Sequence, residues 1–341
     1  MQKLIKLAGA VSVATLLLGG VAMAADPVSA CQVTDTGGVD DRSFNETAWH
    51  GMQKAETELG AKVKVLESQS EVDFDPNITS LLGGDCDVIL TIGFLLGDTT
   101  QKFAEANPDQ KFSIVDYSYD PVLPNVVGQT YATDEAAFLA GYLSAGMTKT
   151  GTVGVFGGLN IPPVTIFMDG FVRGVKYYNT AKSASINVLG WDPDKKEGLF
   201  TNNFDSLDDG RTFAQSLYDE GADIVLPVAG TVGQGSAALA DELGADKLKI
   251  IGVDADLFET NPDRGGVYLT SIVKRMDNTV FDVVKSVADG TFKGGVLQGN
   301  LANGGVDLAP LHAFEDAVPA ELKAELADVR AQIVAGTLSV K

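Results

Sequence analysis

The chain has 341 residues, of which 46 are acidic and 25 basic, giving a formal net charge of −21 at pH 7. Its hydrophobic content of 45% is enough to build a core, which excludes an intrinsically disordered chain. A surface this acidic disfavours nucleic acid and anionic lipid headgroups as partners and points to a neutral or cationic ligand. A general surface bias would explain the same charge, and both interpretations stay open.

Residues 1–24 form a predicted signal peptide. They begin with Lys3 and Lys6, continue as an almost wholly apolar run, and end in the small-x-small triplet Ala-Met-Ala. Cleavage would leave Ala25 first, so we expect an exported protein that is periplasmic or at the cell surface. No later segment approaches about 20 continuous apolar residues, the length that crosses a bilayer.

A second interpretation of this region involves Cys31. Residues 28–31 (Val-Ser-Ala-Cys) fit a loose lipobox, in which Cys31 would carry a lipid anchor. Asp26 and Pro27 separate this box from the apolar run, whereas the two run together in lipoprotein signals. We therefore expect a cleaved, unanchored protein, with lipid anchoring at Cys31 as the alternative.

Short β-branched apolar runs then alternate with longer helical patterns, which is typical of parallel α/β structure. The expected strands of the first half are residues 31–35, 62–67, 88–93, 112–115 and 126–131, and a helix at 134–147 follows them. In the second half the expected strands are 152–156, 184–190, 223–228, 248–253 and 267–273, and the expected helices are 164–178, 206–221, 234–243 and 276–289.

Two similar doubly wound units are therefore expected, an N-terminal lobe of residues 25–150 and a C-terminal lobe of residues 151–275. The segment 148–151 is the expected crossover, and 276–341, with a helix at 320–334, packs back across the lobes. Parallel sheets bind ligands outside the carboxyl ends of their strands, so two facing sheets predict a ligand cleft between the lobes.

The most informative stretch, residues 35–45, follows a strand and opens a helix. Ser43 and Glu46 have the spacing of a capping box, which would start the helix there. Phe44 and Asn45 then fall in the first turn, at the mouth of the cleft. The Phe44 ring is either a stacking platform for a ligand or a hydrophobic contact that closes the loop.

A glycine-rich turn at a helix N-terminus usually indicates phosphate binding. Here Asp35, Asp40 and Asp41 crowd the turn and would repel a phosphate, and only Arg42 offsets them. Carboxylates in a cleft instead suit hydroxyl, amine or ring N–H donors. The turn therefore favours a nucleoside or a polyol over a nucleotide.

The two cysteines fall on neighbouring strands of the expected first sheet. Cys31 starts the first strand, Cys86 lies just before the third, and these strands are adjacent in a doubly wound sheet. A disulfide at the end opposite the ligand is expected in an oxidising compartment, and it competes with lipidation of Cys31. Two buried free thiols are the remaining alternative.

Several motifs in order along the chain resemble the basic membrane protein family of nucleoside-binding proteins, whose members feed ABC importers. The matching segments are VTDTGGVDDRSFNETAWHG (33–51), IGFLLGD (92–98), AAFLAGYLSA (136–145), VGVFGG (153–158), GADIVL (221–226), IGVDAD (251–256) and TSIVKRMD (270–277). The resemblance implies a type I periplasmic-binding fold, a purine nucleoside between the lobes, and ABC permease and ATPase subunits as partners.

By motif position, the resemblance places Asp35 and Phe44 at first-lobe binding positions, with Asn45 beside them. It places Asp254 and Lys274 at second-lobe positions that grip the sugar. Each of these two follows a strand and faces the cleft, so Asp254 could accept from two hydroxyls and Lys274 could donate to a ligand oxygen. A plain salt bridge between Lys274 and Asp254 is the alternative.

Four further candidates come from other strand ends and helix starts: Gly93, Phe94, Asp116 and Phe167. Asp116 would read the base edge, Gly93 and Phe94 would approach the ligand with backbone and ring, and Phe167 would supply an opposing face or belong to the core. Some relatives have an aromatic residue where this chain has Leu226-Pro227. If their second stacking ring comes from there, it is absent here, which weakens the preference for purine.

No catalytic set emerges. His50 and His312 are far apart without metal-ligand spacing, and residues 192–203 depart from a calcium-binding loop. We expect a monomeric binding protein with no metal, no cofactor and no enzymatic activity. Alternatives are the same fold binding riboflavin or another small neutral solute, and a surface or sensory ligand-binding protein.

Overall fold

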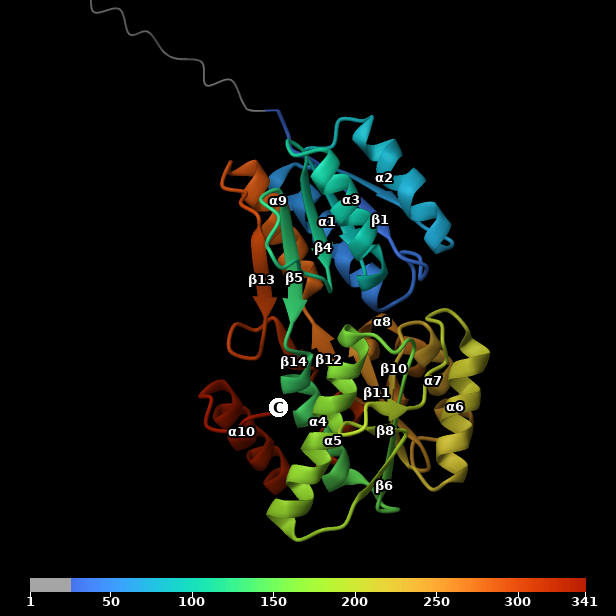
Figure 1. The fold of residues 1–341 in the computed structure, drawn as a ribbon. Coiled ribbons are helices and arrows are strands. Elements are labelled where there is room, and N and C mark those ends of the chain that lie inside the picture. Colours follow the sequence, from blue (N-terminus) through green and yellow to red (C-terminus); the bar gives the residue numbers. More distant parts are fainter. Residues whose placement is uncertain (1–25) are drawn as a thin grey trace, which may run out of the picture.

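The computed structural model describes residues 26–341, so the predicted signal peptide lies outside the described residues. The described chain forms two α/β lobes, each built on one six-stranded sheet, as Figure 1 shows. Within residues 26–341, no helix has the length and apolar character needed to cross a membrane.

The first sheet is wholly parallel. Its strands, in spatial order, are β13 (Gly295–Gly299), β5 (Val126–Tyr131), β4 (Lys111–Val115), β3 (Val88–Ile92), β1 (Ser29–Thr34) and β2 (Lys62–Leu66). Helices α1 (Phe44–Leu59) and α9 (Met276–Ala288) pack together in a core shared with Leu90 and Ile92, whereas α2 (Phe74–Leu82) and α3 (Gly97–Ala106) share a separate core with Ile89 and Phe112. Side chains of alternate parity on β3 thus face opposite helix layers.

The second sheet repeats this order. Its strands are β14 (Val306–Leu308), β12 (Tyr268–Lys274), β11 (Lys249–Asp254), β10 (Ile224–Val228), β6 (Thr152–Gly157) and β7 (Asn187–Leu189), and only β14 is antiparallel. The helices of this lobe are α4 (Thr133–Met147), α5 (Pro162–Lys182), α6 (Leu207–Asp219), α7 (Val232–Leu243), α8 (Leu257–Thr260) and α10 (Ala320–Val334). A small hairpin, β8 (Trp191–Asp192) with β9 (Glu197–Gly198), follows β7.

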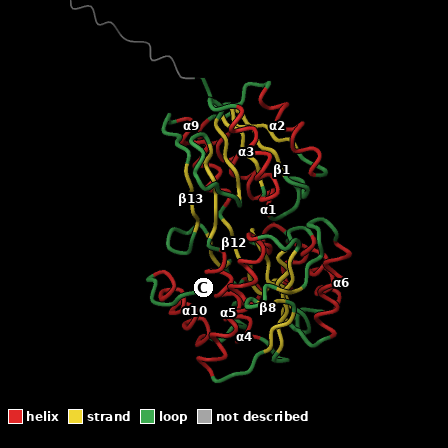
Figure 2. Tube along the Cα trace, viewed as in Figure 1, coloured by secondary structure: helices red, strands yellow, loops and turns green. Residues whose placement is uncertain are grey.

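The chain passes between the lobes three times: from β5 to α4, from β12 to α9, and from β13 to β14. Sequence analysis placed the crossover at 148–151, after α4, but α4 packs against α5 and β12 of the second lobe. The segment 276–341 is likewise divided, because α9 and β13 complete the first lobe while α10 packs on α4 (Figures 1 and 2). The helical pattern of α4 does not reveal which sheet it covers.

The expected strand at 184–190 is shorter in the structure, where only β7 pairs with β6. The strands β13 and β14 and the helices α2 and α3 were not foreseen. β13 is a short Gly-Val-Leu-Gln-Gly segment, and glycine at both ends hides a strand signal.

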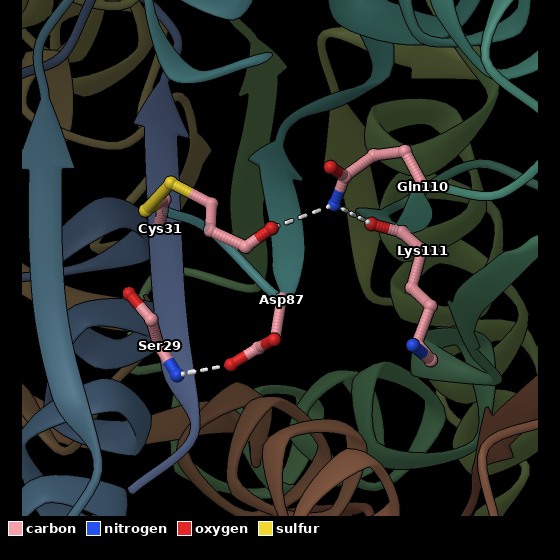
Figure 3. The surroundings of a disulfide bond; sticks show 6 residues. Ser29, Cys31, Asp87, Gln110 and Lys111 are labelled. Atoms are coloured by element: carbon pink, nitrogen blue, oxygen red, sulfur yellow. Dashed lines mark hydrogen bonds between the residues drawn. A yellow bond between two sulfur atoms is a disulfide. The ribbon is translucent and has the colours of Figure 1, made fainter. Parts of the chain in front are cut away.

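The predicted disulfide between Cys31 and Cys86 is confirmed (Figure 3). The two Cα atoms are 5.8 Å apart because β1 and β3 pair directly, with Cys31 opposite Ile89. Gln110 donates a hydrogen bond to the Cys86 carbonyl, and the Ser29 amide donates to Asp87, so the surrounding backbone is also fixed. The bridge joins the amino ends of the strands, away from the cleft.

Candidate ligand-binding cleft

A cavity of ≈630 Å³, partly open to solvent, lies between the lobes at the carboxyl ends of the strands. The nine residues that the sequence singled out all line it: Asp35, Phe44, Asn45, Gly93, Phe94, Asp116, Phe167, Asp254 and Lys274. The structure thus brings together side chains up to 239 positions apart in the sequence, from Asp35 to Lys274.

Helix α1 begins at Phe44 as predicted, but the capping box at Ser43 and Glu46 is wrong. The Asp41 carboxylate caps the helix instead, accepting hydrogen bonds from the backbone amides of Ser43, Asn45 and Glu46. The Ser43 hydroxyl points away from its own helix and donates to the Val253 carbonyl of the other lobe. A motif defined by spacing could not foresee this, because the partner of Ser43 is 210 residues away.

Asp35, directly after β1, is held in position by its neighbours. The Asn45 side-chain amide and the Gly37 backbone amide donate to Asp35 Oδ1 at 2.8 and 3.3 Å. A Cβ at Gly93, whose φ is +119°, would stand 2.6 Å from Asp35 Oδ2, so only glycine fits there. Asn45 Oδ1 is buried and has no hydrogen-bond partner among the described residues, which leaves an acceptor at the cavity wall.

Burial raises the pKa of Asp35 to about 6, against the opposing effect of its hydrogen bonds from Asn45 and Gly37. Burial likewise raises the pKa of Asp41 to about 7, although three backbone amides favour its charged form. Both carboxyls are therefore poised to respond to charge or donors brought in by a ligand.

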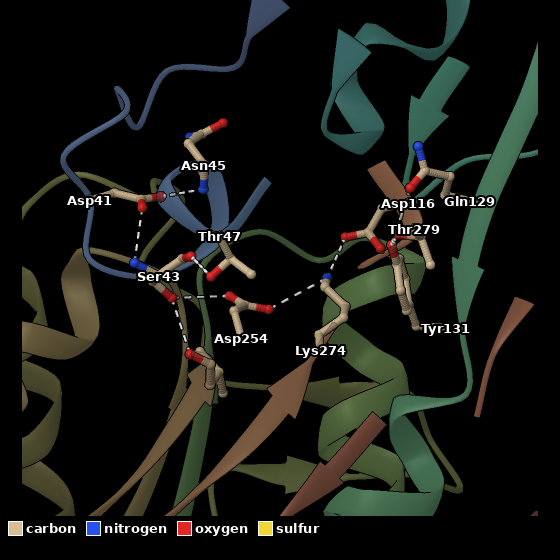
Figure 4. A network of polar contacts seen from close by, with 11 residues as sticks. Asp41, Ser43, Asn45, Thr47, Asp116, Gln129, Tyr131, Asp254, Lys274 and Thr279 are labelled. Atoms are coloured by element: carbon tan, nitrogen blue, oxygen red, sulfur yellow. Dashed lines mark hydrogen bonds and ion pairs between the residues drawn. The ribbon is translucent and has the colours of Figure 1, made fainter. Parts of the chain in front are cut away.

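Lys274 joins the two lobes at the centre of the cleft (Figure 4). Its ammonium lies 2.7 Å from Asp116 of the first lobe and 3.4 Å from Asp254 of the second, and its side chain is 3% exposed. Burial lowers the pKa of Lys274, but the two carboxylates outweigh this effect and hold the pKa above its ordinary value. The salt bridge left open by the sequence is therefore present, with Asp116 as the nearer partner.

Asp116 and Asp254 occupy equivalent places in the two sheets. Asp116 follows β4 and Asp254 ends β11, strands that hold the same position in their sheet orders. Both residues have a left-handed backbone, with φ of 66° and 68°. Such a conformation is uncommon outside glycine and clusters at functional sites, and here it turns both carboxylates toward the same ammonium.

Aromatic rings surround the same ammonium. Lys274 Nζ lies 4.6 Å from the ring centroid of Phe44, 5.3 Å from that of Tyr131 and 5.7 Å from that of Phe167. These distances are within cation–π range. Phe167 is 2% exposed and packs in the core, and it also lines the cavity.

Lining residues that the sequence did not single out include Phe204 and Thr231. Asp41, which the sequence indicated only as part of the acidic turn, also lines the cavity. Phe204 lies in the loop before α6 and packs over Gly158, where an added Cβ would stand 2.3 Å from the ring. The Gly-Gly pair that ends the segment VGVFGG is the sequence signal for this contact, because two residues without side chains leave space for an aromatic ring from another segment. The Thr231 hydroxyl is buried without a hydrogen-bond partner in the described chain.

The lining is strongly acidic on one side. Four carboxylates face the cavity, from Asp35, Asp41, Asp116 and Asp254, and Lys274 is the only basic residue among the described residues that line it. The rest of the second-lobe wall is mainly apolar, with Ile161, Pro163, Val164, Val228, Ala229 and Val253. Such a site suits an uncharged ligand with an apolar body and several hydrogen-bond donors, and it repels anions.

Hydrogen bonds also join the lobes beside the cavity. Arg42 donates to Asn261 Oδ1 at 2.7 Å, and the Thr260 hydroxyl donates to the Arg42 carbonyl at 2.8 Å. The Gln234 side chain donates to the Asp41 carbonyl, also at 2.8 Å. These contacts hold the two lobes closed over the cavity.

Solved structures with this architecture include ABC transporter solute-binding proteins. An ABC transporter solute-binding protein from Aeropyrum pernix K1 superposes with a TM-score of 0.84 at 25% identity, covering 92% of this chain and 93% of that one. A second, from Conexibacter woesei DSM 14684, has a TM-score of 0.70 at 23% identity, over 92% of this chain and 98% of its own. The fold is the type I periplasmic-binding fold.

The family follows from the sequence comparisons. The model of the family described as ABC transporter substrate-binding protein PnrA-like matches residues 28–341. The chain is 33% identical to ABC transporter nucleoside-binding protein BmpA of Lactococcus lactis over 92% of its length and 89% of the relative's. It is 34% identical to basic membrane protein A of Borreliella burgdorferi over 76% of its length and 73% of the relative's. The chain belongs to this family of ABC transporter substrate-binding proteins.

Proposed function

We propose that the protein captures a nucleoside, with a purine base preferred, and delivers it to an ABC importer. The observation that carries the proposal is the convergence of Asp116, Asp254 and Lys274 beside the ring of Phe44 in one cavity between the lobes. Two carboxylates and an ammonium suit the hydroxyls and ring oxygen of a ribose, and an aromatic face suits a planar base.

In this proposal Asp35 and Asn45 contact the base edge. The Asp35 carboxylate accepts from a ring N–H or an amino group, and the Asn45 amide oxygen accepts a second donor. Phe44 stacks on the base, and Phe204 supports an opposing face in place of the aromatic residue that the chain lacks at Leu226-Pro227. Phe94 and Phe167 complete the apolar walls.

The magnitudes fit tight capture. A base stacked on an aromatic ring contributes about 1–3 kcal/mol, and each hydrogen bond to a charged group contributes about 1.5–3 kcal/mol. One stack and two or three such bonds give micromolar affinity or better after the costs of association. Phosphate is disfavoured because the four carboxylates would repel it.

Delivery to an importer places the protein outside the cytoplasm. The predicted signal peptide supports export, and the disulfide supports an oxidising compartment. The bridge engages Cys31, which supports the unanchored protein over lipidation at this residue. Permease and ATPase subunits are the proposed partners, in keeping with the family.

A thermal-shift and calorimetry panel tests the ligand. Inosine, guanosine and adenosine are compared with uridine, hypoxanthine, ribose, riboflavin and inosine monophosphate. At a concentration of 100 Kd a ligand raises the free energy of unfolding by about 2.7 kcal/mol, which shifts the Tm measurably. The proposal expects purine nucleosides to bind and the monophosphate to fail. It is wrong if no nucleoside binds or if riboflavin alone does.

A further inference from the structure

A second hollow adjoins the ligand cavity. It contains ≈790 Å³ including space open to solvent, and it shares Phe94, Asp116, Pro163 and Lys274 with the first cavity. Its remaining lining residues come from the strand ends and helix starts of both lobes: Tyr117, Ser118, Thr130, Tyr131, Thr133, Pro162 and Ile166. The Lys274–Asp116 ion pair therefore lies between two spaces. The family resemblance implies a ligand in the first cavity and leaves the second hollow without an assigned role.

The lining of the second hollow is that of a binding site for an uncharged group. The ring of Tyr117 packs against Phe94 with centroids 5.1 Å apart, and Ile166 and Pro162 add apolar surface from α5. The Tyr131 hydroxyl is already paired with Thr279, so that residue presents mainly its ring.

Thr133 provides an independent indication of a ligand. This first residue of α4 is 2% exposed, lines the hollow, and has a buried hydroxyl with no hydrogen-bond partner among residues 26–341. A buried hydroxyl without a partner is unfavourable by about 1–3 kcal/mol, and a bound group that pairs with it removes this penalty. Nothing in the proposed binding of a plain nucleoside uses this hydroxyl.

We infer that the second hollow is a subsite for an uncharged substituent on the sugar side of the nucleoside, so that the protein accepts sugar-extended nucleosides. The inference rests on the proposed function, which puts the sugar at the Lys274–Asp116 pair that separates the two spaces. A phosphate substituent is excluded by charge, because Asp116 borders the hollow and Lys274 is already shared by two carboxylates.

Calorimetry with a matched pair of ligands tests the subsite: adenosine, and adenosine carrying an N-ethylcarboxamide in place of its 5′ hydroxymethyl group. The amide offers both an acceptor for the Thr133 hydroxyl and an apolar ethyl tail. We expect the wild-type protein to bind both ligands with affinities that differ by less than about tenfold, or about 1.4 kcal/mol.

Substitutions of residues that line only the second hollow should change the affinities for the two ligands to different extents. Ile166→Trp fills the hollow from α5, and we expect it to weaken the extended ligand at least about tenfold while adenosine changes less than about threefold. Thr133→Val removes only the hydroxyl and should weaken the extended ligand about fivefold. Thr165→Trp, next on the same helix but outside both spaces, is the matched control and should change neither affinity.

Two results would overturn the subsite. One is wild-type protein that binds adenosine and rejects the extended ligand. Another is an Ile166→Trp protein whose unfolding transition shows that it is folded but whose affinity falls equally for both ligands. The hollow would then be only a solvent-filled gap beside the crossovers. Should Ile166→Trp fail to fold, Ser118→Phe fills the hollow from the first lobe and decides the same question. Absence of adenosine binding to the wild type overturns the proposed function itself.

Discussion

The two lobes share one strand order but line the cavity with different chemistry. After β1 the first lobe places the carboxylates of Asp35 and Asp41, whereas after the equivalent strand β6 the second lobe places Gly157 and Gly158, over which Phe200 and Phe204 pack. One wall therefore offers acceptors and the other offers apolar surface. These two walls match the two kinds of surface that the proposed nucleoside ligand presents.

The two lobes line the cavity with the same chemistry at Asp116 and Asp254, which share Lys274. Here equivalent strand ends supply equivalent carboxylates with equivalent backbone conformations. In the proposed binding mode, the first lobe contacts the edge of the base and both lobes hold the sugar.

The largest effect is expected for Lys274→Met. This change leaves Asp116 and Asp254 buried without their shared cation, and breaking a buried pair lowers the free energy of unfolding by about 3–5 kcal/mol. Binding should be lost as well. Urea unfolding measures the loss, with Lys176→Met, an exposed lysine of the second lobe, as control. A loss below about 1 kcal/mol would mean that the ion pair is incidental.

The disulfide should stabilise the first lobe without contributing to ligand binding. The Cys31→Ser, Cys86→Ser double variant opens a loop of 55 residues, which the chain-entropy model values at about 4 kcal/mol. Because the bridge lies at the strand ends opposite the cavity, we expect stability to fall and affinity for the nucleoside to stay unchanged. A parallel fall in affinity, or no fall in stability in denaturant, would contradict this separation.

Phe44→Ala tests stacking on the first-lobe wall. The loss of the ring should weaken purine nucleoside binding by about 1–3 kcal/mol, or about 5- to 150-fold, without unfolding the protein. Phe44→Tyr retains a face of similar area and serves as the control. Calorimetric affinities of the two variants that both match the wild type would place the base elsewhere in the cavity.

Asp35→Asn tests the acidic wall through pH. The pKa of Asp35 is about 6 in the folded protein against an ordinary 3.8, so between these values the folded state binds more protons than the unfolded one. The ligand-free wild type should therefore lose stability as the pH rises through this window, by at most about 1.4 kcal/mol per pH unit from this group. Asp35→Asn should flatten that slope in urea unfolding, and Asp109→Asn, at an exposed position, should not. Equal slopes in all three proteins would contradict the assignment.

The smallest effect concerns closure of the lobes. Gln234→Ala removes one hydrogen bond across the cleft and should weaken nucleoside binding by about 1 kcal/mol, or about fivefold, because the closed state loses one contact. Gln215→Ala, whose side chain bonds only within α6, is the control. Small-angle scattering should show more of the open form for Gln234→Ala, and an unchanged affinity would leave this bond without a role in closure.

Much of this organisation is readable from the sequence. Strand periodicity places Asp116 and Asp254 at strand ends, and parallel topology then brings such ends to one edge, so their meeting follows from local signals. The adjacency of β1 and β3 likewise predicts the disulfide.

Long-range pairing accounts for what the sequence does not reveal. The helix cap by Asp41, the bond from Ser43 to Val253, and the approach of Phe204 to Gly158 all depend on how loops meet in space. The lobe to which α4 belongs is hidden for the same reason, because a buried helix shows no signature of the sheet it covers. The hydrophobic periodicity of a helix shows which of its residues are buried, but it does not show which sheet they pack against.

A co-crystal structure with inosine would locate the base and the sugar between the two lobes. We expect the ribose hydroxyls to lie within hydrogen-bond distance of Asp116 or Asp254, the base to stack on Phe44, and its edge to meet Asp35. A nucleoside bound outside this cavity, or one with its base at Asp254 and its sugar at Asp35, would contradict the division between the lobes.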